Sequence, residues 1–175
     1  MIGTEQVLKS SVDYFNGDVR RINHFIKVFG FAKAIGVLEQ IDAVTQEILE
    51  VTAIVHDIGI KVSEEKYSSS AGNYQQIEGP AVAKVLLSSL GYPCGFIERV
   101  CFLIAHHHTY NDIQGQDYQI LVEADFLVNI YEDSMNRESV EQIKRKIFKT
   151  RAGTEFLNSL YLNKDASASV QKAKE

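Results

Sequence analysis

The sequence predicts an all-α fold, and three observations lead to this prediction. Apolar residues recur at the spacing of amphipathic helices, and no stretch alternates polar and apolar residues between hairpin turns. Apolar residues make up 45% of the chain and charged residues 23%, which is the balance of a folded globular protein. The length of 175 residues fits one domain, which we place at 1–162, followed by a polar tail over 163–175.

The first three helices are predicted from residues that can cap them. Thr4 and Asp18 can cap the first two helices, and Asp42 can cap a third. The second half of this third helix, 51–55, is nearly all apolar, so the helix should cross the core. Gly59 follows closely and is expected to terminate it.

The rest of the chain is predicted as helices separated by two loops. Residues 61–75 are polar, contain three consecutive serines and show no sustained period, so we expect a loop there. A second loop is expected over 109–117. The further helices are expected over 76–90, from Pro93 to His107, over 118–133, over 139–149 and over 154–161.

Charge and cysteine content narrow the class of partner. The net charge of −5 argues against duplex nucleic acid or an anionic membrane as the main partner, which leaves a small molecule or another protein, with a homodimer as an open alternative. Cys94 and Cys101 lack both the density of a disulfide framework and the spacing of a zinc ribbon, so they are expected to be intracellular core thiols. Glu5 and Lys9 interrupt any signal peptide, and we expect a cytoplasmic protein without a membrane span.

Histidines and carboxylates at inward positions indicate a metal site. All five histidines fall inside or at the ends of apolar helices, and Asp57 directly follows His56. Asp125 stands on the inward stripe of its helix, where a leucine would be expected. Burying such groups without partners is costly, and ligands from separate helices are what a metal site in a bundle core needs. Adjacent side chains on a helix diverge by about 100°, so His56 and Asp57 can converge only near a helix end, which Gly59 would supply, or across two metals.

His24 shares its helix face with two cations. Arg21 lies one turn before it and Lys27 three residues after it, so this face combines a metal-ligand type with anion binders. Taken singly, each of these residues is more often a satisfied structural group than a ligand. Taken together with the other histidines and carboxylates, they favour a metal site that acts on an anion.

The order of His24, then His56 and Asp57, then Asp125 resembles the H…HD…D signature of the HD-domain superfamily of metal-dependent phosphohydrolases. The resemblance covers residues 18–132. It implies a compact multi-helix bundle with the metal site in its core, and it implies that these four residues hold the first metal.

Part of the sequence also resembles a two-metal branch of that superfamily, the cyclic-dinucleotide phosphodiesterases. The segment EGP that begins at Glu78 resembles a His-Pro step, and His106 and His107 resemble a pair of ligating histidines. This implies a second metal held by Glu78, His106 and His107, with Asp57 bridging. The alternative is that Glu78 only favours a helix start and that the histidines contact substrate or solvent, which leaves one metal. We expect two. Ile60 after HDIG, and the lack of a DGxGYP loop, argue against cyclic di-GMP as the substrate.

Three residues are expected to contact substrate. Arg21 resembles the R-x-x-H opening of the family, which implies a phosphate-facing cation, and Lys27 is expected to bind phosphate oxygens with it. His108 is assigned to substrate because three consecutive histidines cannot all face inward. Glu123 is expected either to orient a ligating imidazole or to lie at the surface.

These features predict metal-dependent hydrolysis of a phosphoester or phosphoanhydride in a small molecule, with a nucleotide as the expected substrate. One or two divalent ions (Mn, Fe, Mg, Co or Zn) would activate water, and Arg21, Lys27 and Asp57 are the expected catalytic residues. The alternatives are an HD-type di-iron oxygenase, which oxygen consumption would reveal, and a regulatory or binding module without activity.

Overall fold

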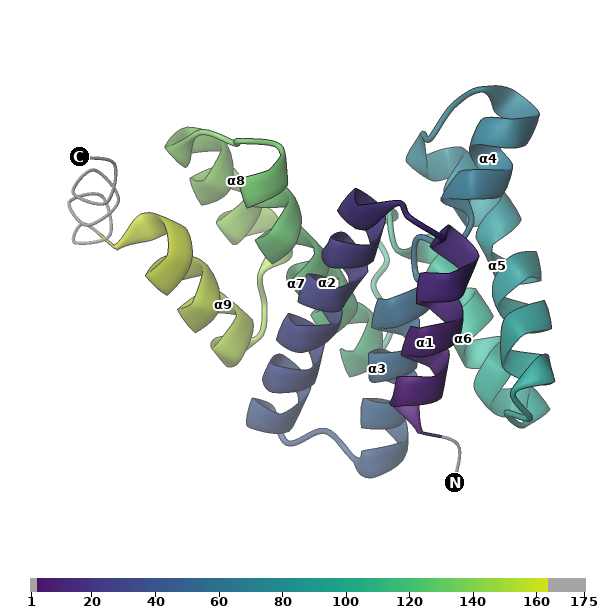
Figure 1. Cartoon of the computed structure of the whole chain (residues 1–175). Helices are drawn as coiled ribbons and strands as arrows, with labels where there is room; N and C mark the ends of the chain where they lie inside the picture. The colour runs from purple at the N-terminus through teal and green to yellow at the C-terminus, as the bar shows by residue number, and fades with distance from the viewer. Residues whose placement is uncertain (1–2, 164–175) are drawn as a thin grey trace.

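The computed structural model of the protein describes residues 3–163, and the prediction of an all-α fold is confirmed for them: helices are their only regular elements (Figure 1). The predicted tail falls, from residue 164 on, outside the described residues. In order, the helices are α1 (Thr4–Phe15), α2 (Val19–Leu38), α3 (Ala43–Val55), α4 (Ile60–Tyr67), α5 (Gly72–Ser89), α6 (Cys94–His106), α7 (Gln116–Glu132), α8 (Arg137–Ile147), α9 (Arg151–Leu157) and the π-helical turn η1 (Asn158–Leu162).

Two of the three predicted caps are confirmed. The Asp18 carboxylate accepts a hydrogen bond from the backbone N–H of Arg21, and Asp42 accepts from those of Val44 and Thr45. These bonds satisfy donors that the helix itself leaves free. The cap predicted for the first helix is wrong. Gly3 occupies that position, makes no side-chain hydrogen bond, and leaves Thr4 as the first helical residue.

The loop predicted over 61–75 is also wrong, because α4 occupies its first half and only 68–71 separate α4 from α5. Of the eight residues of α4 only Ile60 and Ser63 are buried, so its sequence shows no clear apolar period. Packing on α5 and the ion pair from Lys66 to Glu78 hold this short helix in place. Tertiary contacts therefore determine a helix that local propensity does not.

The helices form two apolar clusters, and α2, α3 and α6 contribute buried residues to both. The first cluster also includes α7 and the C-terminal helices, and the second also includes α1 and α5. Residues 51–55 of α3 are all buried, so this helix crosses the core as predicted. No helix within residues 3–163 is both long and apolar enough to span a bilayer.

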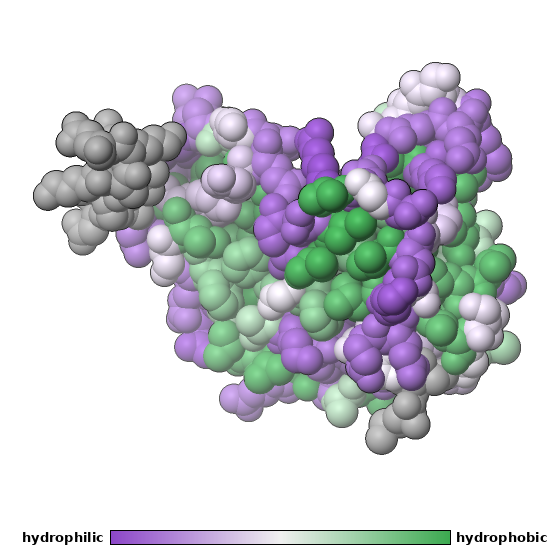
Figure 2. All heavy atoms as spheres, in the orientation of Figure 1, coloured by the Kyte–Doolittle hydropathy of each residue, from purple (hydrophilic) through white to green (hydrophobic). Residues whose placement is uncertain are grey.

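The surface is hollowed between the start of α2 and α4. Hydrophilic side chains line both sides of this depression at the upper edge of Figure 2, whereas apolar side chains show lower down between α1 and α2. A cavity of about 240 Å³ lies at this place. Its lining residues are Asp18, Arg20, Arg21, His24, Asp57, Ile60, Ser70, Gln75, Asn129 and Glu132.

Candidate metal centre

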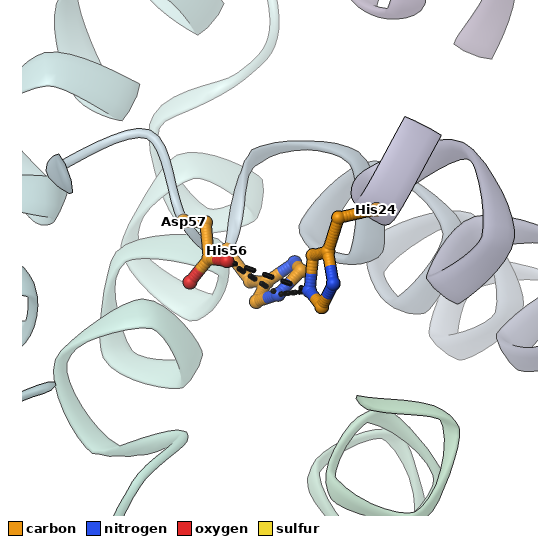
Figure 3. A group of neighbouring side chains, drawn as sticks. All are labelled: His24, His56 and Asp57. Atoms are coloured by element: carbon orange, nitrogen blue, oxygen red, sulfur yellow. Dashed lines mark hydrogen bonds and ion pairs between the residues drawn. The ribbon is translucent and has the colours of Figure 1, made fainter. Parts of the chain in front are cut away.

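The four residues of the predicted first site converge beside this cavity, which His24 and Asp57 line. His24 comes from α2, His56 and Asp57 come from the turn after α3, and Asp125 comes from α7. The Nε2 atom of His24 lies 3.3 Å from Nε2 of His56 and 3.5 Å from Oδ2 of Asp57 (Figure 3). It lies 3.2 Å from Oδ1 of Asp125. The Nε2 atom of His56 lies 3.4 Å and 3.7 Å from the same two oxygens. Three separate segments thus bring two imidazoles and two carboxylates together.

A tight turn after α3 allows the adjacent His56 and Asp57 to face the same centre. Gly59 lies in this turn at φ −73°, so it does not end the helix in the left-handed conformation expected of a terminator. Glycine is needed here because the turn closely approaches the backbone of α5. A Cβ at residue 59 would lie 2.6 Å from the backbone nitrogen of Gly79 and 2.8 Å from the carbonyl oxygen of Gln75. Glycine therefore lets the turn rest directly on the backbone of α5.

The rings of three histidines point one nitrogen into the centre and the other away from it. Nδ1 of His56 and Nδ1 of His107 lie 2.9 Å and 2.8 Å from backbone carbonyl oxygens three residues earlier, to which they donate. Nδ1 of His24 donates to the Glu132 carboxylate at 2.9 Å. In the neutral ring, a proton on Nδ1 leaves a lone pair on Nε2, which is the form that binds metals.

One buried nitrogen of the centre is free to bind a further group. Nε2 of His107 is buried and has no hydrogen-bond partner among residues 3–163, and it lies 3.5 Å from Oδ1 of Asp57. Native structures rarely leave a buried polar atom without a partner. A divalent cation bound by imidazole and carboxylate would satisfy it, so the residues present fit a metal.

The metal-free centre balances its charges with protons. Burial lowers the pKa of His56, but the charge of Asp57 and the hydrogen bond to Asp125 outweigh it and raise that pKa well above the usual value. Burial raises the pKa of Asp57, but His56 and His107 hold it well below its ordinary range. A proton therefore competes with a metal for the His56 imidazole, and metal binding should release that proton.

Two groups of potential ligands share one carboxylate. The ligand atoms of His24, His56 and Asp57 lie within 4.8 Å of one another, and so do those of Asp57, His107 and His108. Asp57 directs Oδ2 towards the first group and Oδ1 towards His107. The bridging position expected for Asp57 agrees with this arrangement.

The histidine pair that faces Asp57 is His107 and His108, and not His106 and His107 as predicted. Nδ1 of His106 donates to the carbonyl oxygen of Phe102 at 2.7 Å, and its ring stacks on the Phe102 ring at 4.3 Å, so it does not join the centre. Because α6 ends at His106, the turn that follows carries His107 and His108 inward. Burial, followed by the charge of His107, lowers the pKa of His108 to about 4, so its ring is neutral at pH 7.

Glu78 does not reach the centre, which corrects the prediction of it as a ligand. It is buried, but its carboxylate accepts from Lys66 Nζ at 2.7 Å and from the Tyr67 hydroxyl at 2.8 Å. Both partners lie on α4, the helix that the sequence did not predict. Hydrogen bonds from these two residues also hold the pKa of Glu78 below its usual value.

The predicted phosphate-binding cations are both engaged elsewhere. Arg21 lines the cavity, but it pairs with Asp18 at 2.7 Å and with Glu64 at 2.6 Å. Lys27 pairs with Glu132 and does not line the cavity. The neighbouring Arg20 lines the cavity and has no carboxylate partner among residues 3–163, so the structure adds it as an anion-binding candidate.

Sequence reasoning missed two residues of α7 that contact the ligand set. Asn129 donates from Nδ2 to Oδ1 of Asp125 at 2.9 Å, and Glu132 accepts from His24. They follow Asp125 by four and seven residues, so the inward stripe that identified Asp125 could have revealed both.

Glu123 has neither of the two roles expected for it. It is fully buried, and its carboxylate accepts from the backbone N–H groups of Lys149 at 2.7 Å and Thr150 at 2.9 Å, just before α9. These bonds tie the start of α9 to α7, so Glu123 stabilises the fold rather than orienting an imidazole.

Comparisons with known proteins agree with this architecture. A family model described as the HD domain matches residues 21–149. The crystal structure of a predicted HD superfamily hydrolase from an uncultured Thermotogales bacterium is similar, with a TM-score of 0.67 and 21% sequence identity. The match covers 96% of this chain and 89% of that chain, so the two share a fold over nearly their whole length. No curated protein matches the sequence.

Proposed function

We propose that this chain, which belongs to the HD domain family, is a metal-dependent phosphohydrolase. Its substrate would be a phosphoester or phosphoanhydride of a small molecule, and nucleotides are the first class to test. One observation carries the proposal. Imidazole nitrogens and carboxylates gather in one centre, among them Nε2 of His107, which lacks a hydrogen-bond partner within residues 3–163. His24 and Asp57 of this centre line a cavity that arginines also line.

The residues divide into two metal-holding groups. His24, His56, Asp57 and Asp125 would hold the first ion, and Asp57, His107 and His108 would hold a second. A divalent ion of the Mn, Fe, Mg, Co or Zn class would lower the pKa of a water molecule and polarise a phosphoryl oxygen. Asp57 is central to both groups, because each of its oxygens faces a different histidine.

The cavity walls would bind and orient the phosphate. Arg20 can attract phosphate oxygens without first breaking an ion pair, whereas Arg21 would have to release Asp18 or Glu64. The volume of about 240 Å³ lies below the range of about 300–1,000 Å³ for sites that enclose drug-sized ligands. We therefore expect the phosphoryl group and its nearest neighbours to be enclosed while the rest of the substrate extends into solvent.

Hydrolysis by metal-loaded protein, followed as release of phosphate, pyrophosphate or the freed alcohol, tests this proposal. Purified protein would be loaded with each of the five metals in turn and assayed against nucleotides, simple phosphomonoesters and phosphodiesters. We expect turnover with at least one metal, its loss in His56→Ala and Asp57→Ala, and its retention in His106→Ala, which changes a nearby histidine outside the centre. Oxygen consumption without hydrolysis of any of these substrates would identify an oxygenase instead. Metal binding without either activity would identify a regulatory module, and both results would overturn the proposal.

A further inference from the structure

His24 is connected to the protein surface through two further charged residues. Its Nδ1 donates to Oε2 of Glu132 at 2.9 Å, and the other oxygen of Glu132 accepts from Nζ of Lys27. The side chains of His24 and Glu132 are only 10% and 16% exposed. Lys27 lies three residues after His24 on α2, and Glu132 is the last residue of α7, so the three residues also join two helices.

This arrangement distinguishes His24 from the other two inward-facing rings. His56 and His107 donate from Nδ1 to neutral backbone carbonyls, whereas His24 donates to a carboxylate. A carboxylate behind an imidazole fixes the ring orientation and tautomer, and it makes the opposite nitrogen a stronger donor to a metal. Of these three rings, His24 therefore has the most strongly polarised Nε2.

We propose that Glu132 is a positioning residue for the metal centre, that it acts through His24, and that Lys27 holds Glu132 in place by binding its second oxygen. This assigns Lys27 a role in metal binding in place of the phosphate contact expected from the sequence. The inference rests on the metal binding contained in the proposed function, but it requires no particular reaction or substrate.

A second lysine–glutamate pair provides a matched control. Lys66 binds Glu78 at 2.7 Å, with side-chain exposures of 55% and 11% against 43% and 16% for Lys27 and Glu132. Both pairs join a half-exposed lysine to a largely buried glutamate on another helix. Only the pair of Lys27 and Glu132 contacts a ligand histidine.

The first measurement is the dissociation constant for Zn²⁺, obtained by competition with a chromogenic chelator. We expect Glu132→Gln to weaken binding by about 10- to 100-fold and Lys27→Met to weaken it less. The control variants Glu78→Gln and Lys66→Met should match the wild type. Glu132→Gln is nearly isosteric and can still accept a hydrogen bond, so it changes the charge with little change in packing.

The second measurement detects the hydrogen bond itself. In ¹H–¹⁵N spectra of Zn²⁺-loaded protein, the Nδ1–H of His24 should be shifted downfield and protected from exchange. In Glu132→Leu this signal should lose both properties, while the corresponding signals of His56 and His107 persist. This change would show that the hydrogen bond exists in the metal-loaded protein, and the Zn²⁺ affinities show whether it acts on the metal.

The outcomes separate this inference from the proposed function. If Glu132→Gln binds Zn²⁺ as tightly as Glu78→Gln does, or if the His24 signal is unchanged in Glu132→Leu, the positioning role is refuted even where the wild type hydrolyses phosphate esters. Should Glu132→Leu not fold, the affinity of Glu132→Gln decides. Absence of metal binding by the wild type would refute both the inference and the proposed function.

Discussion

Replacement of Gly59 by alanine should disrupt the turn that carries the centre. A Cβ at this position would lie 2.6 Å from the nitrogen and 2.8 Å from the Cα of Gly79, and 2.8 Å from the carbonyl oxygen of Gln75. Ordinary van der Waals contact begins near 3.4 Å, so the shortest approach is about 0.8 Å too close. All three atoms belong to the backbone of α5, and no side-chain rotation can relieve the overlap.

The expected loss of stability follows from this overlap. Inserting a methyl group into a packed interior costs about 1–3 kcal/mol, and an obstacle made of backbone favours the upper part of this range. Replacing glycine at a helical φ of −73° returns about 0.4–1 kcal/mol by restricting the unfolded chain. A net loss of about 1–2 kcal/mol corresponds to a Tm lower by about 2–8 °C for a domain of this size.

Thermal unfolding followed by circular dichroism measures this effect in the metal-free protein. Gly30→Ala is the matched control, because it lies within α2 and a Cβ there would meet nothing within 4 Å. That variant should be as stable as the wild type or more stable by up to about 1 kcal/mol. If Gly59→Ala proves as stable as Gly30→Ala, close packing against α5 is not the reason for glycine in the turn.

Three further predictions concern the centre and its cavity. Metal affinity measured by calorimetry should rise from about pH 6 to about pH 8, because His56 must lose a proton held by a raised pKa. The raised pKa of His56 also stabilises the metal-free fold at low pH, and this stabilisation is lost as the pH rises through that pKa. A Tm of the metal-free protein that does not fall with rising pH would contradict the raised pKa. Arg20→Ala should raise KM for a phosphate ester by about 10- to 100-fold and Arg21→Ala by less, with metal content unchanged in both. A larger effect of Arg21→Ala would instead favour Arg21 as the phosphate-binding cation, as the sequence predicted. His108→Ala should lower bound metal from about two ions per chain towards one while Glu78→Gln does not, as measured by elemental analysis.

The sequence was sufficient for the part of the site that follows from helical periodicity. His24 and Asp125 lie on apolar faces where a polar group requires a partner, and the structure brings both to the centre with His56 and Asp57. The caps at Asp18 and Asp42 were predictable for a similar reason, since a short polar side chain before an apolar period is a local signal.

The errors occur where geometry depends on the end of a helix or on tertiary contacts. A shift of one residue rotates a side chain by about 100°, so locating the end of α6 decides whether His106 or His108 faces inward, and helix ends are uncertain by one or two residues. Glu78 was misassigned because its partners Lys66 and Tyr67 lie on a helix stabilised by packing. The sequence does not indicate that Arg20 rather than Arg21 is available to bind an anion. The two adjacent arginines differ in that Arg21 forms ion pairs with Asp18 and Glu64, which only the structure shows.

The position of the centre has a consequence for stability. Asp125 belongs to α7, which packs in one apolar cluster, whereas His108 contacts Gln75 of α5, which packs in the other. Asp57 lies in the turn after α3, one of the helices that contribute to both clusters. A metal held by these residues would therefore join the two halves of the core through ligands rather than through apolar contact. Because binding to the folded state alone stabilises it by mass action, metal loading should protect both clusters together from unfolding.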